Sequence, residues 1–169
     1  MRVATLEALV KALNRRRVRY LIVGGLAVAA HGFGRATFDV DLVVQLKPDN
    51  VLRALRALAS LGYRPLVPVA ATDFANPVLR RKWIREKNMV VFAMHSDRDP
   101  ETRVDLFVTE PFPFDREYDR ALAGEILPGA RARFVRVETL IRMKRKAGRA
   151  KDLEDIRQLE LFRGRHRAR

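Results

Sequence analysis

The sequence of 169 residues contains no cysteine, which excludes disulfide bonds, thiolate metal sites and cysteine nucleophiles. It has no long hydrophobic run either: the longest, 20–30, is too short to cross a bilayer and lacks the small-residue exit of a signal peptide. Acidic residues are scarce, with 20 Asp and Glu against 34 Lys and Arg, so the formal net charge is +14. We therefore expect a cytoplasmic protein without a membrane partner. The charge favours polyanionic partners, although an arginine-rich composition can also reflect the genome.

The length of the chain is that of one domain, and 48% hydrophobic with 32% charged residues is typical of a folded protein. No repeat or linker divides it. We expect a single domain over 1–169, with C-terminal helices packed on it at 138–162 and a basic tail at 163–169. Hydrophobic periodicity predicts helix 5–16, strand 19–23, helix 26–31, strand 38–46, helix 49–61, an irregular stretch 63–87, a hairpin of strands 89–95 and 103–109, helix 115–123 and a strand pair within 125–137. This order predicts an α/β (α+β) fold, a central mixed β-sheet flanked by helices.

Two aspartates, Asp39 and Asp41, interrupt the apolar segment FDVDLVVQL at 38–46. Because strand side chains alternate, residues at i and i+2 point the same way, and Val40 and Leu42 are expected to face the core. Two half-buried like charges on one face repel each other and are costly to desolvate. A hard divalent cation offsets that cost, and Mg²⁺ is typically held by one or two carboxylates together with substrate phosphates.

A third carboxylate, Asp105, interrupts a second apolar segment at 103–109. On a strand next to that of Asp39 and Asp41, it would complete a site for two Mg²⁺ ions ~3.5–4 Å apart, with Mn²⁺ as an alternative. One ion would activate an attacking hydroxyl and the other would bind the triphosphate, while Asp105 could act as general base. We expect these three aspartates to be catalytic metal ligands.

A purely structural interpretation of the carboxylates competes with this one. A strand aspartate can pair with arginine, for which Arg35 and Arg103 are available, or face solvent at a strand end. An isolated D-x-D pair also occurs often by chance. The third carboxylate and a glycine pair upstream favour the functional interpretation.

That glycine pair, Gly24-Gly25, lies between an expected strand and an expected helix. Glycine permits a tight turn and a close backbone approach, and amides at a helix N-terminus attract phosphate, although such a pair can also serve only the turn. Arg35 and Thr37 precede the aspartates, where they could contact phosphate or simply lie in a surface loop. We take all four as candidate nucleotide-binding residues.

The segment LIRMKRKAGRAKDLEDI, at 140–156, is expected to form parts of two charge-rich helices. Its residues alone favour a solvated face rather than a site. His31 is expected to pack or cap locally. Trp83, among basic residues, could anchor the core or stack on a base.

Taken together, VGGLAVAAHGFGRATFDVDLVV at 23–44 and RVDLF at 103–107 resemble the minimal nucleotidyltransferase superfamily, the DNA polymerase beta-like proteins. That superfamily has a Gly-Gly or Gly-Ser turn, a short helix, a strand with D-x-D and a third acidic residue on another strand. Gly24-Gly25, Asp39, Asp41 and Asp105 match these positions one by one. The resemblance implies a nucleotidyltransferase fold, Mg²⁺ as cofactor and ATP or another nucleoside triphosphate as substrate.

The later segment at 140–156 is similar to a helix of the abortive-infection branch, which includes the type IV toxin–antitoxin nucleotidyltransferases and their stand-alone relatives. In that branch a lysine and an acidic residue of the late helices assist nucleotide binding. The resemblance implies these roles for Lys144 and Asp152, and an antitoxin protein as a partner.

The sequence thus predicts a metal-dependent transfer of a nucleoside monophosphate from a nucleoside triphosphate to an acceptor hydroxyl, with release of pyrophosphate. The basic composition favours an RNA acceptor such as a tRNA end, with a small molecule such as an antibiotic, or a protein side chain, as alternatives. Two rival functions remain: a nucleotidyltransferase-like binding module or toxin–antitoxin partner without turnover, and a basic RNA-binding domain whose aspartates are structural.

Overall fold

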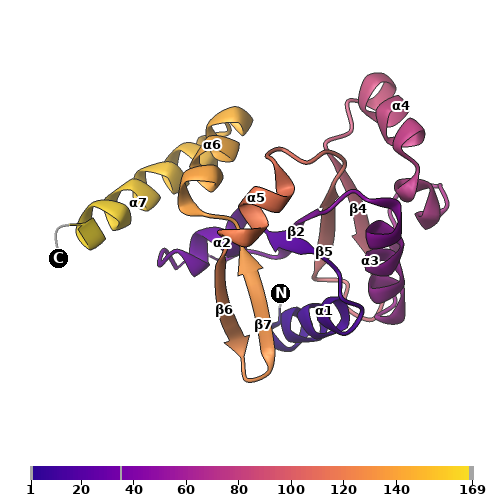
Figure 1. Cartoon of the computed structure of the whole chain (residues 1–169), viewed down its shortest axis with the longest axis horizontal. Coiled ribbons are helices and arrows are strands. Elements are labelled where there is room, and N and C mark those ends of the chain that lie inside the picture. The colour runs from indigo at the N-terminus through magenta and orange to yellow at the C-terminus, as the bar shows by residue number, and fades with distance from the viewer. Residues whose placement is uncertain (1, 35, 168–169) are drawn as a thin grey trace.

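The computed structural model describes residues 2–34 and 36–167, with the backbone alone at 127 and 162–167. In this part of the chain seven strands form one mixed sheet in the order β3-β4-β5-β2-β1-β7-β6. Figure 1 labels β2, β4, β5, β6 and β7 of this sheet. The strands are β1 (Tyr20–Ile22), β2 (Asp39–Val44), β3 (Arg64–Pro65), β4 (Val91–His95), β5 (Arg103–Phe107), β6 (Leu122–Leu127) and β7 (Ala130–Phe134). The helices are α1 (Val3–Arg15), α2 (Gly24–Ala30), α3 (Pro48–Ser60), the 3₁₀ helix η1 (Ala71–Ala75), α4 (Pro77–Lys87), α5 (Phe114–Asp119), α6 (Val137–Ala147) and α7 (Ala150–Arg167). The predicted α/β class, with helices flanking a central mixed sheet, is confirmed.

Strand β2 lies at the centre of the sheet, antiparallel to β1 and parallel to β5. The predicted hairpin is present, since β4 pairs antiparallel with β5. The register places Asp41 directly opposite Asp105, and Asp105 opposite Ala93 on β4. Paired residues on neighbouring strands lie on the same face of a sheet, so this register decides which side chains meet.

One face of strands β4 and β5 is packed by aromatic side chains from η1 and α4. Phe92 on this face is stacked between Phe74 of η1, with ring centroids 5.0 Å apart, and Trp83 of α4, at 5.6 Å. Leu106, paired with Phe92 across the strands, is fully buried. Trp83 therefore anchors the core, one of the two roles considered for it, and its ring is occupied by this stack.

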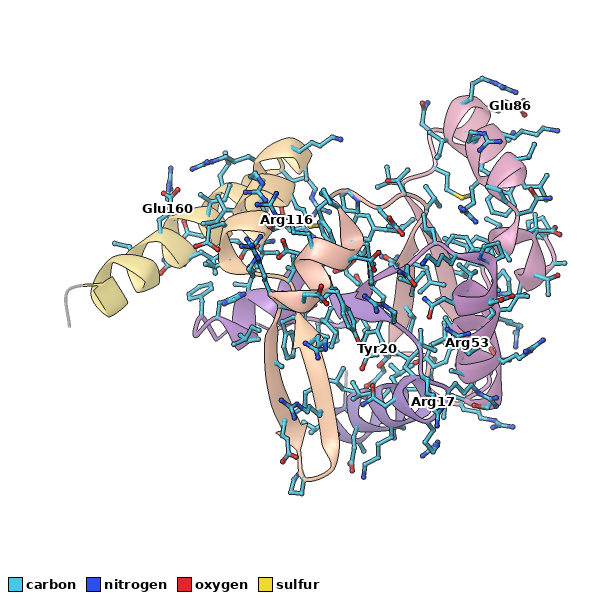
Figure 2. All side chains as sticks on the ribbon, in the orientation of Figure 1. Arg17, Tyr20, Arg53, Glu86, Arg116 and Glu160 are labelled. Atoms are coloured by element: carbon cyan, nitrogen blue, oxygen red, sulfur yellow. The ribbon has the colours of Figure 1, made fainter. Side chains whose placement is uncertain are left out.

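The other face of the sheet carries α2, α5 and α6. The start of α2 lies over Asp41, and α5 is tied to the end of β2 by a hydrogen bond of 2.8 Å from Gln45 to Asp115. Helix α6 packs against α2. Figure 2 shows Tyr20 near the middle of the molecule, while Glu86 on α4 and Glu160 on α7 lie towards its opposite sides. No helix in the described residues is both long and apolar enough to span a membrane.

Several elements differ in extent from the sequence prediction. Helix α4 occupies part of the stretch expected to be irregular, and β6 begins at Leu122, inside the expected helix 115–123. The C-terminal helices expected at 138–162 correspond to α6 and α7. Because α7 continues to Arg167, the segment expected as a basic tail is helical to that residue, and 168–169 lie outside the described part.

Candidate active site

Three aspartates from two strands share one face of the sheet. Asp39 and Asp41 are at i and i+2 on β2, and Asp105 is the cross-strand partner of Asp41 on β5. Val40, between the first two, is 1% exposed and faces the opposite side. The structure therefore brings together the three carboxylates that the sequence singled out.

Crowding and burial change the electrostatics of these carboxylates. The pKa of Asp41 is raised to about 6, first by burial and then by the charges of Asp105 and Asp39, against a lowering influence of Lys144 and Arg149. Burial also raises the pKa of Asp105. Both ionised carboxylates are therefore held at a cost in free energy, as expected for like charges on one half-buried face.

Gly24 lies directly against this cluster. Its φ of +64° is in the left-handed region, and a Cβ atom placed on it would lie 2.6 Å from Cγ of Asp41 and closer still to Oδ2. A Cβ atom on Gly25 would lie 2.9 Å from the Oγ1 atom of Thr37. The glycine pair thus allows the start of α2 to approach the carboxylate strand more closely than any other residue would permit.

Of the two candidate nucleotide-binding residues just before the aspartates, the structure describes Thr37 but not Arg35. The Thr37 hydroxyl donates a hydrogen bond of 3.4 Å to the carbonyl oxygen of Asp39, so this side chain helps to fix the entry to β2. Arg35 lies outside the described residues. A contact of either side chain with nucleotide stays a prediction.

Arg103, which the sequence analysis considered only as an ion-pair partner, lies within the cluster. Its Nη2 atom is 3.3 Å from Oδ2 of Asp39 and 3.0 Å from Oδ2 of Asp105. Asp39 and Asp105 therefore pair with an arginine, as the purely structural interpretation of the carboxylates predicted. Asp41 forms no ion pair with any residue that the structure describes.

The donor atoms fit a hard divalent cation, although their present arrangement does not enclose one. Within the described residues, no group of three or more histidine, aspartate or glutamate side chains is arranged to hold a metal ion. Oδ1 of Asp105, however, is buried without a hydrogen-bond partner, and an unsatisfied buried oxygen costs about 1–3 kcal/mol. Carboxylate oxygens are the ligands that Mg²⁺ prefers. The chemistry of the site suits the ion, and Arg103 shares the oxygens that would bind it.

A buried ionic network joins helices α6 and α7. Lys144, 5% exposed, places Nζ 2.6 Å from Oδ2 of Asp155 and 3.3 Å from Oδ1 of Asp152. Arg149 adds an Nε contact of 2.6 Å to Asp152. The solvated face expected from these residues alone is wrong for Lys144 and Asp152. A signal was present: Lys144 follows Leu140 by four positions, on the buried stripe of α6.

The positive charges of this network influence the carboxylate site, since Lys144 and Arg149 both lower the pKa of Asp41. Whether Lys144 or Asp152 contacts nucleotide stays a prediction. His31, expected to pack or cap locally, instead makes a contact distant in sequence: its Nε2 atom lies 2.8 Å from the carbonyl oxygen of Val135.

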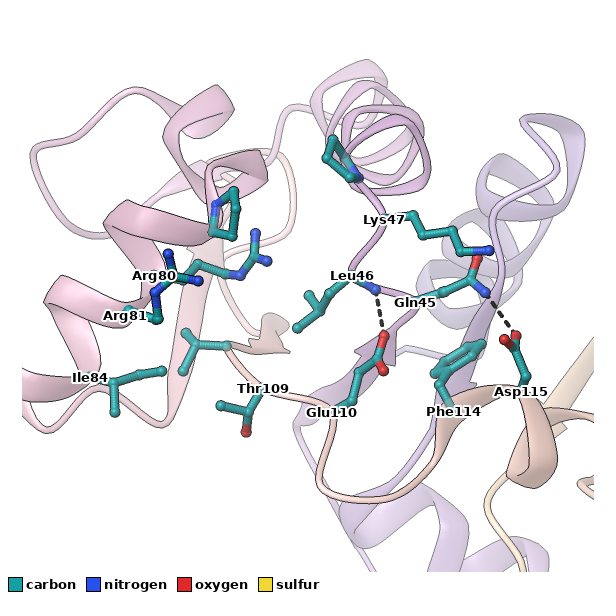
Figure 3. Close-up of a pocket in the computed structure, with 13 residues that line it drawn as sticks. Gln45, Leu46, Lys47, Arg80, Arg81, Ile84, Thr109, Glu110, Phe114 and Asp115 are labelled. Carbon is teal, nitrogen blue, oxygen red and sulfur yellow. Dashed lines mark hydrogen bonds between the residues drawn. The ribbon is translucent and has the colours of Figure 1, made fainter.

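A cavity of about 600 Å³ lies at the other end of the same two strands (Figure 3). Its walls come from the segment after β2, the segment after β5, helix α4 and the start of α5. Leu46 in its wall is five residues beyond Asp41, about 16 Å along an extended chain. The cavity is thus separate from the three carboxylates.

No family model and no curated protein matches the chain. Solved structures do. The solution structure of the antibiotic-resistance factor ANT(2'')-Ia has a TM-score of 0.60 at 16% identity, covering 98% of this chain and 91% of that one. The crystal structure of ANT(2'')-Ia in complex with adenylyl-2''-tobramycin has a TM-score of 0.59 at 14% identity, covering 98% and 97%. A crystal structure of an antigenic nucleotidyltransferase-like protein from Paracoccidioides brasiliensis has a TM-score of 0.54 at 17% identity, covering 93% and 74%.

These neighbours establish the fold: the chain has the nucleotidyltransferase fold predicted from its motifs. None of the three is described as a member of the abortive-infection branch, so that finer assignment stays a prediction.

Proposed function

We propose that the protein is a metal-dependent nucleotidyltransferase that transfers a nucleoside monophosphate from a nucleoside triphosphate to an acceptor hydroxyl. The observation that carries the proposal is the register of β2 and β5, which places Asp39, Asp41 and Asp105 on one face beneath the Gly24 turn. Like charges held together at a cost in free energy are typical of sites built for a cation and a phosphate.

Each residue has a distinct role in this proposal. Asp39, Asp41 and Asp105 would hold the divalent cation, which supplies charge neutralisation for the phosphates and activates the attacking hydroxyl. Asp105, whose pKa is raised by burial, accepts the proton of the acceptor hydroxyl. The acceptor oxygen bonds to the α-phosphorus, the α–β bridging bond breaks and pyrophosphate leaves. Gly24 and Gly25 would bind nucleotide through their backbone, which lies against Asp41 and Thr37 because neither glycine has a side chain.

The direct test offers each labelled nucleoside triphosphate to the protein with Mg²⁺ and total RNA. We expect label from at least one triphosphate in acid-precipitable RNA, with pyrophosphate released in equal amount and both signals abolished by EDTA. Product formation that is undiminished in EDTA would contradict the metal site. Magnesium-independent RNA binding without any product, with every triphosphate and with small hydroxyl acceptors too, would favour the binding-module alternative.

For the acceptor, the overall charge favours a polyanion. A small-molecule acceptor has support in the neighbour solved with adenylyl-2''-tobramycin. Tobramycin, however, is a polycation, and this chain carries a formal net charge of +14, which repels cations and attracts nucleic acid. We therefore propose RNA as the acceptor class, with a small hydroxyl compound as the second candidate.

The cavity at the far end of β2 and β5 offers a place for the RNA backbone. Lys47 and Arg81 line it and are exposed, and neither forms an ion pair within the described residues. Arg80, also in its wall, is buried and donates a hydrogen bond of 2.6 Å to the carbonyl oxygen of Phe74. Of the two acidic residues in its wall, Asp115 is paired with Arg19 at 2.8 Å, and Glu110 accepts a 2.7 Å hydrogen bond from the Leu46 amide. Figure 3 shows the two arginines on the α4 side, across from Gln45 and Glu110.

Removing two of these cations is expected to weaken RNA binding. For Lys47→Ala with Arg81→Ala, we expect the dissociation constant of a 20-nucleotide RNA to rise about tenfold. The slope of log affinity against log salt should fall by ~1.4, which is ~0.7 for each lost phosphate contact. Fluorescence anisotropy between 50 and 200 mM salt measures both quantities. Both residues are exposed, so folding should be unaffected.

The matched control removes the same two charges elsewhere. Arg56 on α3 and Lys82 on α4 are exposed and lie outside the cavity. Arg56→Ala with Lys82→Ala should change the affinity less than twofold. An equal loss in both double variants would mean that only the overall charge of the protein attracts RNA.

A further inference from the structure

The position of Arg103 follows from the sheet register. Arg103 is the cross-strand partner of Asp39 and precedes Asp105 by two residues on β5, so its side chain shares a face with both. One nitrogen, Nη2, contacts the Oδ2 atoms of both carboxylates, at 3.3 and 3.0 Å. A single cationic atom thus bridges two aspartates from different strands.

The bridge lies on the solvent side of the cluster. The Arg103 side chain is 46% exposed and that of Asp39 is 45% exposed, whereas the Asp105 side chain is 6% exposed. Burial disfavours the guanidinium charge, yet the charges of Asp105, Asp39 and Asp41 raise the pKa of Arg103. All three carboxylates therefore stabilise this one cation, and a long, half-exposed side chain can leave without disturbing the core.

We infer that Arg103 is an internal counter-ion, which neutralises the aspartates in the metal-free protein and is displaced when a divalent cation binds. This inference rests on the proposed metal site. The guanidinium and a divalent cation would compete for the carboxylates of Asp39 and Asp105, because two cations held by one pair of carboxylates repel each other. Oδ1 of Asp105 is buried without a hydrogen-bond partner, so this carboxylate is incompletely satisfied even with Arg103 in place.

Displacement gives Arg103 a second task. Once released from Asp39 and Asp105, the half-exposed guanidinium would be free to pair with the phosphates of a nucleotide bound beside the carboxylates. Guanidinium groups bind phosphate oxygens through two parallel hydrogen bonds. The arginine would therefore exchange carboxylate partners for phosphate partners when metal and nucleotide bind. Without metal, the same arginine neutralises part of the negative charge of the carboxylates.

The test measures Mn²⁺ binding without nucleotide, by the electron paramagnetic resonance signal of free Mn²⁺. Arg103→Gln is expected to bind Mn²⁺ at least about tenfold more tightly than the wild type, because the competing cation is absent. Arg56→Gln, the same charge change on exposed α3, should stay within twofold of the wild type. Unchanged or weaker binding in Arg103→Gln would overturn the inference.

A second measurement uses the wild-type protein, so it does not depend on the folding of a variant. The guanidinium protons of Arg103 should exchange with water slowly in metal-free protein and at least several-fold faster once Mg²⁺ is added, as seen by NMR. Exchange that does not respond to Mg²⁺ would contradict displacement. The double variant Asp39→Ala with Asp41→Ala distinguishes failure of the proposed metal site from failure of the counter-ion inference. Mn²⁺ binding that survives this change refutes the proposed metal site. If Mn²⁺ binding needs both aspartates but ignores Arg103, only the counter-ion inference fails.

Discussion

Replacing Asp41 by asparagine is expected to lower nucleotidyl transfer by about 10³-fold while leaving the metal-free protein at least as stable as the wild type. The amide keeps the shape of the side chain but removes the charge that would bind the cation and stabilise the developing charge of the reaction. Because burial and two neighbouring aspartates raise the pKa of Asp41 to about 6, its ionised form is destabilised in the folded state. Loss of that charge relieves repulsion, as substitutions at strained functional sites often do.

The sign of the pH dependence makes this prediction sharper. A raised carboxyl pKa means that the protonated form stabilises the fold at pH below about 4, and that this stabilisation is lost as the pH rises through about 6. The Asp41→Asn variant should therefore melt at a higher temperature than the wild type at pH 7.5 without metal, and at about the same temperature at pH 4. Scanning calorimetry in EDTA measures the difference at both values.

Asp119→Asn serves as the control, since Asp119 is exposed at the end of α5, away from β2 and β5. It should retain activity within twofold. If Asp41→Asn keeps more than a tenth of wild-type transfer, the Asp41 carboxylate is not part of the reaction centre.

The two strands that carry the aspartates were predictable, because a carboxylate inside an apolar segment is unusual. A carboxylate inside an apolar strand stands out without any tertiary information, and strand alternation then fixes the face that Asp39 and Asp41 share. The sequence does not show which strand pairs with β2, or in which register. Only the register of β2 with β5 places Asp105 opposite Asp41 and Arg103 opposite Asp39. The bridging arginine was therefore visible as a candidate but not as a member of the site.

Two other features show where sequence patterns fall short. Helix α4 is capped by Asn76, whose side chain accepts a hydrogen bond of 2.9 Å from the Val78 amide, and it begins at Pro77. This Asn-Pro pair is a helix start signal, but the strongly basic run after it hides the apolar periodicity. Lys144 illustrates the converse, since a lysine reads as solvated unless its partners Asp152 and Asp155, on the next helix, are known.

Replacing Gly24 by alanine is expected to lower activity strongly and to destabilise the protein as well. The left-handed backbone conformation at φ +64° costs a residue with a Cβ atom about 1–2 kcal/mol. The added methyl group would also collide with the Asp41 carboxylate, so either the side chain or the start of α2 must move. We expect a loss of at least about 10²-fold in transfer and a lower melting temperature. Transfer assays and thermal unfolding measure the two effects.

A double-mutant cycle shows whether the damage comes from this collision. In Gly24→Ala with Asp41→Ala, two of the three nearest atoms, Oδ2 and Cγ, are gone, and only Cβ remains, 2.9 Å away. Part of the lost stability should therefore return although activity does not, which is a coupling between the two positions. Gly124→Ala is the control, because the space around Gly124 on β6 is open. Purely additive stability effects would mean that backbone strain alone, and not a fit between the turn and the carboxylate, requires glycine at this position.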